Sequence, residues 1–168
     1  MEMPPSILFI LNVVIIALAG AIIEIVMEKE NGWGGALDKK TWYGKVIGEN
    51  NRVLKFLARS AGVPYFFGYA IAMYFVLVPS ILLFEYTVFD QSIVFFIVIY
   101  FSILALEDFT WFLLNPYFHS LRELLKGPNG SIWWHKKWVK IGNQCYLPKS
   151  YFISIVVVLT LLILNQYI

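Results

Sequence analysis

The chain has 168 residues, of which 60% are apolar, 18% are aromatic and only 14% are charged. Soluble globular proteins are about 45–50% apolar and about 25% charged, so this composition excludes a soluble domain, a disordered tail and a nucleic-acid-binding protein. The single cysteine excludes a disulfide framework within the chain. The net charge is only +2, but the charges are distributed very unevenly. The composition therefore predicts a polytopic membrane protein.

Four apolar stretches are long enough to cross a bilayer, which takes about 20 helical residues. They cover residues 5–27, 64–84, 92–114 and 150–168. Because a span in lipid must satisfy its own backbone polar groups, we expect an all-α integral membrane protein with four transmembrane helices in a single domain, residues 1–168. The first stretch is expected to be retained as a helix rather than cleaved as a signal peptide, since no Lys or Arg precedes it.

All 13 basic residues fall into two segments, residues 28–63 and 115–149. Both termini and the short connection over residues 85–91 have none. The positive-inside rule then predicts that both long segments are cytoplasmic and that both termini lie outside the cell membrane. An even number of spans agrees with this orientation.

The first long segment contains a predicted basic amphipathic helix over residues 46–61. Such a helix lies on the inner leaflet and favours anionic lipids. Its apolar face is formed by Val53, Leu54, Leu57 and Ala61, and its basic face by Arg52, Lys55 and Arg59.

The second long segment begins at Asn115-Pro116, where a break or kink is expected because the residue before proline resists helical geometry. A further helix is predicted over residues 117–126, and the Gly and Pro residues of 127–130 end it. Residues 132–140 combine tryptophans with lysines, which is typical of an interfacial belt. We expect Lys136 and Lys137 to lie at the membrane surface.

Acidic residues inside the spans are the most informative feature of the sequence. Glu24 and Glu28 lie one turn apart in the first span, and Glu107 and Asp108 lie in the third. Carboxylates in spans are costly and mark a functional site by default. At about 1.5 Å per residue, Glu24 lies about 5 Å and Glu107 about 10 Å from the inner end of its helix. The acids of two helices are therefore predicted to share one inner layer.

Small residues indicate how these spans pack. Ala17, Gly20 and Ala21 share the face of Glu24, and small residues let another helix approach closely. We expect the first three spans to enclose the acids and the nearly uniform aliphatic fourth span to face lipid. If the third helix continued through Pro116, a polar stripe would follow one of its faces, formed by Asp108, Trp111, Asn115, His119, Arg122 and Lys126.

Three modes of neutralisation are open for the buried acids. They can pair with loop bases or with Trp and Asn donors, they can be protonated, or they can bind a metal ion. Carboxylates with imidazoles suit Zn, Fe or Mn, although the Glu-x-x-His pattern of di-iron bundles is absent. The candidate metal ligands are Glu24, Glu28, Glu107, Asp108, His119 and His135. The candidates for the surrounding shell or for substrate contact are Trp33, Trp111, Asn115 and Trp134.

The same residues carry a resemblance to a group of small microbial integral membrane proteins. The shared pattern comprises Glu24-x3-Glu28, Gly32-Trp33, Thr41-Trp42, Glu107-Asp108-x2-Trp111-Phe112-x2-Asn115-Pro116 and Trp134-His135-x2-Trp138. The resemblance covers the first and third spans and both long segments. It implies no activity or cofactor.

Three functions remain in competition. The first is a membrane metal-binding protein or metalloenzyme, in which a carboxylate acts as a base towards a metal-bound water or a lipid-borne substrate. The second is a small proton- or ion-coupled transporter. The third is a non-catalytic subunit, a homo-oligomer or an assembly factor of a membrane complex. The sequence has no phosphate-binding loop and no nucleophile constellation, so no catalytic residue is assigned.

Overall fold

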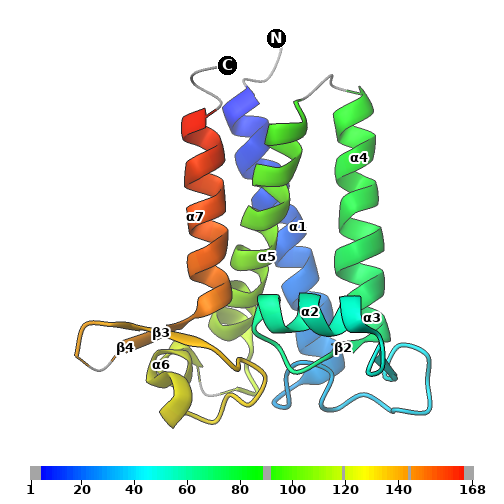
Figure 1. Ribbon diagram of the computed structural model, residues 1–168, viewed down its shortest axis with the longest axis vertical. Helices are drawn as coiled ribbons and strands as arrows, with labels where there is room; N and C mark the ends of the chain where they lie inside the picture. The colour runs from blue at the N-terminus through cyan, green and yellow to red at the C-terminus, as the bar shows by residue number, and fades with distance from the viewer. Residues whose placement is uncertain (1–4, 89–91, 119, 144, 165–168) are drawn as a thin grey trace.

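The computed structural model describes residues 5–88, 92–118, 120–143 and 145–164. Helices predominate (Figure 1), which confirms the all-α class. Their bounds are α1 (Pro5–Glu28), α2 (Arg52–Ala61), α3 (Gly68–Ala70), the π-helix η1 (Ile71–Leu77), α4 (Val78–Val88), α5 (Ile93–Leu114), α6 (Ser120–Lys126), the 3-10 helix η2 (Gly127–Asn129) and α7 (Lys149–Leu164). Two short antiparallel pairs, not expected from the sequence, are β1 (Val46–Ile47) with β2 (Phe66–Phe67) and β3 (Trp138–Ile141) with β4 (Cys145–Pro148).

Three helical stretches are long and apolar enough to cross a membrane: Phe9–Glu28, Gly68–Val88 and Ile93–Leu114. The second begins and ends four residues later than the predicted 64–84, because Phe66 and Phe67 pair with β1 before the helix starts. Glu85 therefore lies inside α4, where it accepts a hydrogen bond from Asn12 at 2.6 Å. The fourth apolar helix, α7, has 16 residues, and the end of its predicted span, 165–168, lies outside the described residues.

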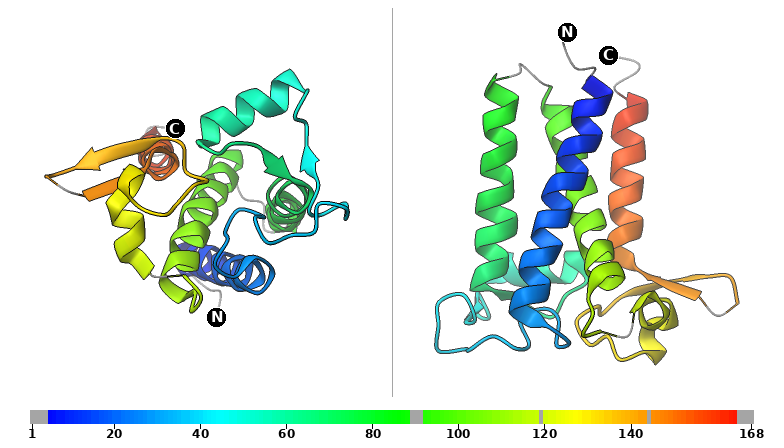
Figure 2. Two further views of the ribbon diagram at one scale, coloured as in Figure 1. Left: turned by 90° about the horizontal axis from the view of Figure 1, so that it is seen from below. Right: turned by 180° about the vertical axis from the view of Figure 1, so that it is seen from behind.

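The long helices form a bundle around α5, which contacts α1, α4 and α7. Figure 2 shows α5 between these helices in the view from below. The fourth span was expected to face lipid outside the first three, and exposed side chains such as Ile155 and Leu159 do line one side of α7, but its other side packs against α5. Its Tyr151 and Ser154, one turn apart, are both buried, so its polar positions face the bundle.

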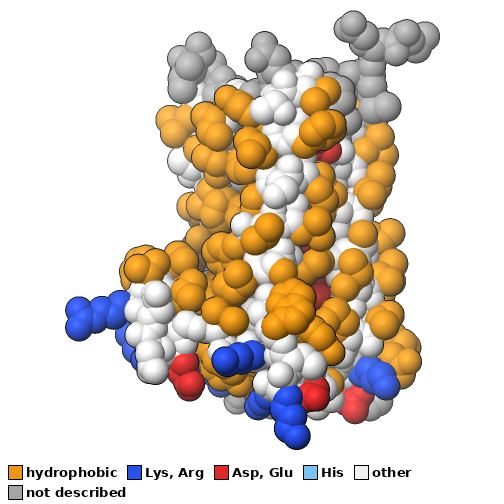
Figure 3. All heavy atoms as spheres, turned by 90° about the vertical axis from the view of Figure 1, so that its right-hand side faces the viewer, with side chains coloured by type: hydrophobic (Ala, Val, Ile, Leu, Met, Phe, Trp, Pro, Cys, Tyr) orange, Lys and Arg blue, Asp and Glu red, His pale blue; other side chains and the backbone are white. Residues whose placement is uncertain are grey.

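The two ends of the bundle differ in charge. The start of α1 and the end of α7 lie at one end, and α2, α6 and both strand pairs lie at the other (Figure 1). Figure 3 shows apolar side chains over the shaft, and Lys and Arg gathered at the second end. The predicted membrane-surface bases are all exposed: Arg52, Lys55, Arg59, Lys136 and Lys137.

The predicted 46–61 helix is shorter in the structure because its first residues form β1. Helix α2 begins after Asn51, whose side chain accepts hydrogen bonds from the amides of Val53 and Leu54 at 2.9 and 3.1 Å and so caps the helix. Leu54 packs inward with Ala58, whereas Val53 is exposed. The predicted apolar face of α2 is therefore divided, since Leu54 packs against the protein and Val53 is exposed to the surroundings.

The predicted break at Pro116 is confirmed, since α5 ends at Leu114. The polar stripe that required a continuous helix is therefore wrong, and Asn115 instead joins α5 to the end of α1 by donating to the carbonyl of Lys29 at 2.6 Å. Helix α6 starts at Ser120, later than predicted, and ends before Gly127 as predicted.

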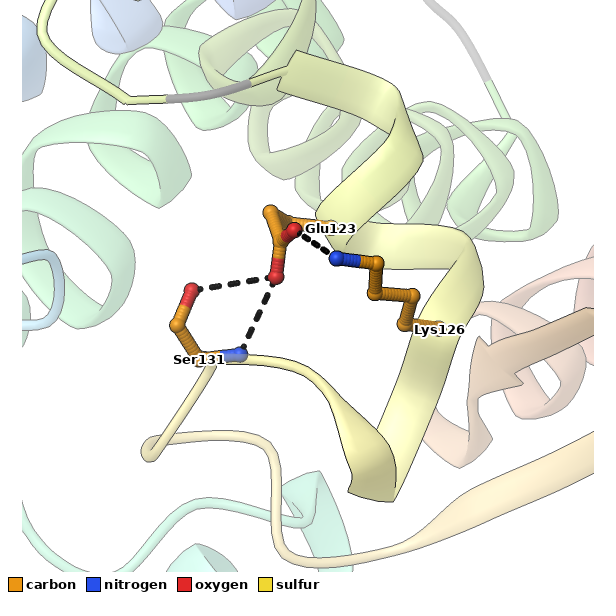
Figure 4. Close-up of polar contacts among 3 residues, drawn as sticks. All are labelled: Glu123, Lys126 and Ser131. Carbon is orange, nitrogen blue, oxygen red and sulfur yellow. Dashed lines mark hydrogen bonds and ion pairs between the residues drawn. The ribbon is translucent and has the colours of Figure 1, made fainter.

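A partly exposed carboxylate organises the turn after α6 (Figure 4). Glu123 accepts from the Lys126 ammonium and from the amide and hydroxyl of Ser131, the latter two at 3.2 and 3.3 Å. The hydrogen bond from Lys126, followed by that from the Ser131 amide, lowers the pKa of the Glu123 carboxyl. This carboxylate closes a local turn, and with 17% of its side chain exposed it is more accessible to water than Glu24, Glu28 and Glu107.

Candidate functional site

Glu24 of α1 and Glu107 of α5 share one hydroxyl group. Their side chains are 5% and 3% exposed, and the Tyr74 hydroxyl lies 2.5 Å from Glu24 Oε1 and 2.9 Å from Glu107 Oε2. A phenol carries one hydrogen, so it donates to one carboxylate only. Both contacts are hydrogen bonds when the other carboxyl is protonated and donates to the phenol oxygen. The geometry thus accommodates one proton shared within this trio.

The position of Tyr74 follows from a proline five residues later. Pro79 has no N–H, so it leaves the carbonyl of Tyr74 without a π-helical donor, and the amide of Val78 donates to Met73 instead. The Tyr100 hydroxyl of α5 replaces the missing donor, at 2.7 Å from the Tyr74 carbonyl. The π-helix η1 is thereby fixed to α5, with Tyr74 directed at the carboxyl pair.

Small residues of α1 make room for this arrangement. Ala17 and Ala21 are fully buried, and a Cβ at Gly20 would lie 3.0 Å from Glu107 Cγ. The predicted close approach of another helix to this face is therefore confirmed. A larger residue at position 20 would displace the Glu107 side chain.

Glu28, one turn beyond Glu24, has a different environment. Its Oε1 accepts from the Tyr69 hydroxyl and from the amide of Gly34 at 2.5 Å. Gly34 has φ +68°, and a Cβ there would lie 2.4 Å from the Phe67 ring, so only glycine brings this amide to Glu28 without strain. Glu28 therefore holds the loop after α1 against the start of the second membrane helix.

Asp108 faces a histidine from the second long segment. His135 Nε2 lies 3.1 Å from Asp108 Oδ2, and Tyr151 of α7 lies beside the same carboxyl. His135 is 7% exposed and is surrounded by aromatic rings, including Phe112 and Trp138. Three segments distant in sequence therefore meet at Asp108.

One cavity of about 470 Å³ is lined both by Glu24, Tyr74 and Glu107 and by Asp108 with His135. Its polar lining includes Glu24, Tyr74, Glu107, Asp108, His135 and Tyr151, and the rest is mainly apolar. Glu107 Oε1 is buried and has no hydrogen-bond partner among the described residues, whereas Asp108 Oδ2 and His135 Nε2 face each other at 3.1 Å. The bundle thus encloses a carboxyl oxygen that its own described side chains do not satisfy.

The structure distributes the predicted site residues over three places. Glu24, Glu107, Asp108, His135 and Trp33 line the cavity, whereas Glu28 does not. Trp111 and Trp134 form an adjoining aromatic core, in which Trp134 stacks on Phe112 at 5.9 Å, and Asn115 joins helix ends. His119 lies outside the described residues.

Tyrosine hydroxyls contact the buried acids, in addition to the partners considered from the sequence. Among the described residues, no Lys or Arg forms an ion pair with Glu24, Glu28, Glu107 or Asp108, and the donors to these acids include tyrosines that could not be identified from the sequence. Within the same residues, no group of three or more His, Cys, Asp or Glu side chains is arranged to hold a metal ion.

Comparisons with known proteins leave the geometry as the basis for function. No protein-family model matches the chain, and neither the curated proteins nor the solved structures contain a significant match.

Proposed function

We propose that the protein is a small proton-coupled transporter, in which the carboxyl cluster releases a proton when it binds a positively charged ligand. One observation carries this proposal. Glu24, Glu107 and Asp108 line one cavity whose described lining contains no Lys or Arg. Ionised carboxylates without a partner are costly in a membrane interior, so such a site favours either protons or a cation. Exchange of one for the other keeps the charge of the site constant.

The proton shared around Tyr74 supports the same function. Removal of that proton leaves a second negative charge beside the first, and an incoming cation offsets it. Two carboxylates that contact the same phenol oxygen repel each other strongly in a low-dielectric medium. Cation binding and proton release are therefore thermodynamically linked at Glu24 and Glu107.

The proposed orientation follows the distribution of bases. We place four spans across the cell membrane, with α7 as the fourth, and the end that contains α2, α6 and the strand pairs on the cytoplasmic side. The carboxyl cluster then opens nearer the cytoplasmic surface. The exposed bases of α2 contact anionic lipid headgroups in this arrangement.

The test is proton release on addition of a cation. Purified protein in lipid nanodiscs is mixed with K⁺, tetramethylammonium or tetraphenylphosphonium in a weakly buffered solution that contains a pH indicator. We expect at least one of these cations to release protons from the wild type, and Glu24→Gln or Glu107→Gln to reduce the release at least tenfold. Glu85→Gln is the matched control, because this carboxyl lies inside α4 but does not line the cavity.

Binding must then be extended to transport. In proteoliposomes, an outward proton gradient should drive uptake of the cation that releases protons, and Glu24→Gln should abolish this uptake. Absence of proton release with every cation would contradict the proposal. Equal release from Glu24→Gln and the wild type would contradict it as well.

A metal site is the second candidate, and the pair Asp108–His135 is the observation that favours it. The Oδ2 and Nε2 atoms of this pair, 3.1 Å apart, are ligand types for Zn, Fe or Mn. Elemental analysis of the purified protein separates the two candidates. Stoichiometric metal that is lost in Asp108→Asn would favour the metal site over proton exchange.

A further inference from the structure

The walls of the cavity differ sharply from its polar end. Aromatic side chains from four parts of the chain line it, including Trp33, Tyr74, Phe75, Tyr100 and Phe101. Aliphatic side chains of α5 and α7, such as Leu104 and Ile153, complete the walls. A small hydrated ion would lose its water shell against these surfaces, whereas an apolar group is favoured by about 25 cal/mol for each Å² removed from water.

The aromatic walls also suit a positive charge. The face of an aromatic ring attracts a cation within about 6 Å, and aromatic cages recognise quaternary ammonium groups in this way. At the polar end, Glu107 Oε1 is an acceptor with no hydrogen-bond partner among the described residues, and Asp108 Oδ2 faces His135 Nε2 at 3.1 Å. Carboxyl oxygens and aromatic faces together therefore favour an organic cation over a neutral lipid.

The exposed part of the cavity wall, its mouth, lies mainly among apolar side chains. Phe75 of η1 lines the cavity and is 42% exposed, and Leu57, Ala61 and the exposed Ser60 of α2 border the same space. Figure 1 shows α2 lying across the lower end of the bundle, in front of α5. A ligand that reaches this mouth arrives from the lipid surrounding the helices, at the level of the amphipathic helix.

On the basis of the exchange site proposed above, we infer that its ligand is a lipophilic organic monocation, an amine or onium ion whose apolar groups fill the aromatic part of the cavity while its charge lies beside Glu24, Glu107 and Asp108. The cavity volume of about 470 Å³ falls in the range of sites that enclose drug-sized ligands, about 300–1,000 Å³. A monocation replaces a single proton, in agreement with the one proton shared around Tyr74.

Two probes of equal charge test the ligand class. Binding of tetraphenylphosphonium and of tetramethylammonium is measured in nanodiscs by equilibrium dialysis, with empty nanodiscs subtracted, and released protons are counted in parallel. We expect tetraphenylphosphonium to bind at least 100-fold more tightly than tetramethylammonium and to release about one proton for each cation bound.

Variants that fill the cavity locate the binding. Ser154→Phe on α7 places a ring in the space, and we expect tetraphenylphosphonium to bind at least tenfold more weakly. The matched control, Thr160→Phe on the same helix, changes an exposed residue that does not line the cavity and should leave binding unchanged. Ala105→Leu on α5, which narrows the same cavity, repeats the test if Ser154→Phe does not fold.

The outcomes separate this inference from the proposed function. Proton release by K⁺ or tetramethylammonium but not by tetraphenylphosphonium would overturn the ligand class and leave proton exchange intact. Absence of release with all three cations would overturn both. Tetraphenylphosphonium binding that is unchanged in Ser154→Phe, Ala105→Leu and Glu24→Gln would show that the cation binds outside this cavity, and would overturn the ligand class.

Discussion

Two buried carboxyl regions lie one helical turn apart on α1, and they differ in how their oxygens are satisfied. Glu28 is 1% exposed, and donors from Tyr69 and Gly34 converge on it. Glu24 and Glu107 are also buried but share one phenol, and Glu107 Oε1 has no hydrogen-bond partner among the described residues. The first region lies outside the cavity and the second lines it.

This difference shows that burial alone does not identify a functional acid. A carboxylate such as Glu28 already accepts hydrogen bonds from a loop and a neighbouring helix, so its oxygens stabilise the fold and are not available to a ligand. A carboxyl with an unfilled oxygen beside a cavity retains capacity for a ligand. We therefore expect substitutions in the Glu28 region to change stability and substitutions in the Glu24–Glu107 region to change ligand and proton binding.

The largest effect is expected for Glu28→Ala. The Tyr69 hydroxyl and the Gly34 amide lose their acceptor inside the protein, and each buried unsatisfied donor costs about 1–3 kcal/mol. We expect a loss of about 4 kcal/mol in the free energy of unfolding, measured by denaturant titration in detergent. Glu28→Gln keeps an acceptor oxygen and should lose less than half as much. A Glu28→Ala variant of wild-type stability would contradict the structural role of this region.

The second largest effect is expected for Tyr100→Phe, a substitution that acts on the Glu24–Glu107 region and not on the Glu28 region. Its hydroxyl is the donor to the Tyr74 carbonyl, so its removal costs about 2 kcal/mol and frees η1 from α5. We expect reduced proton release by cations, because Tyr74 is no longer held at the carboxyl pair. The control is Tyr86→Phe in α4, on a residue that does not line the cavity. Unchanged proton release in Tyr100→Phe would contradict the link between η1 and the pair.

Much of the difference between the Glu28 region and the Glu24–Glu107 region could not be predicted from the sequence. Apolar length and charge predict the long helices, Asn115-Pro116 predicts the end of α5, and acids in apolar spans indicate where a site lies. Tyr69, Tyr74 and Tyr151 could not be identified as partners, because a tyrosine in an apolar helix has the same pattern whether it faces lipid or a carboxyl. The distinction between Glu24 and Glu28 depends on these tyrosines.

Two further features, the irregular second span and the orientation of α7, are indicated by residues in the sequence. Pro79 inside the second span indicates a disturbed helix, and the π-helix η1 ends two residues before it. Tyr151 and Ser154, spaced one turn apart in α7, indicate a polar face that turns this helix towards α5. The strand pair β3–β4 has only four residues in each strand, and its aromatic and basic residues are as typical of a membrane interface as of a hairpin.

A smaller effect on stability is expected for the double variant Glu24→Gln with Glu107→Gln. One carboxyl of this pair already carries a proton when both contacts with Tyr74 are hydrogen bonds, and glutamine resembles a neutral carboxyl in shape and hydrogen-bonding capacity. We expect the free energy of unfolding to change by less than about 1 kcal/mol, while proton release by cations is lost. A loss of stability as large as that of Glu28→Ala would remove the distinction between the two regions.

The smallest effect is expected at Glu123, a carboxylate with donors like those of Glu28 but in contact with water. The Lys126 hydrogen bond, and after it the Ser131 amide, lower its pKa in the folded protein. Its contribution is therefore fully present above the ordinary glutamate pKa of about 4.3 and is lost as the pH falls through the lowered value. Protonation of Glu123 should weaken the hydrogen bond from the Ser131 amide. In that acidic range, and only there, we expect this amide to exchange its hydrogen faster than its intrinsic pH dependence predicts. Glu123→Gln should abolish the extra pH dependence. Because an exposed ion pair is screened by water, global stability should be unchanged in Glu123→Gln. A global loss would mean that hydration does not separate this carboxylate from Glu28.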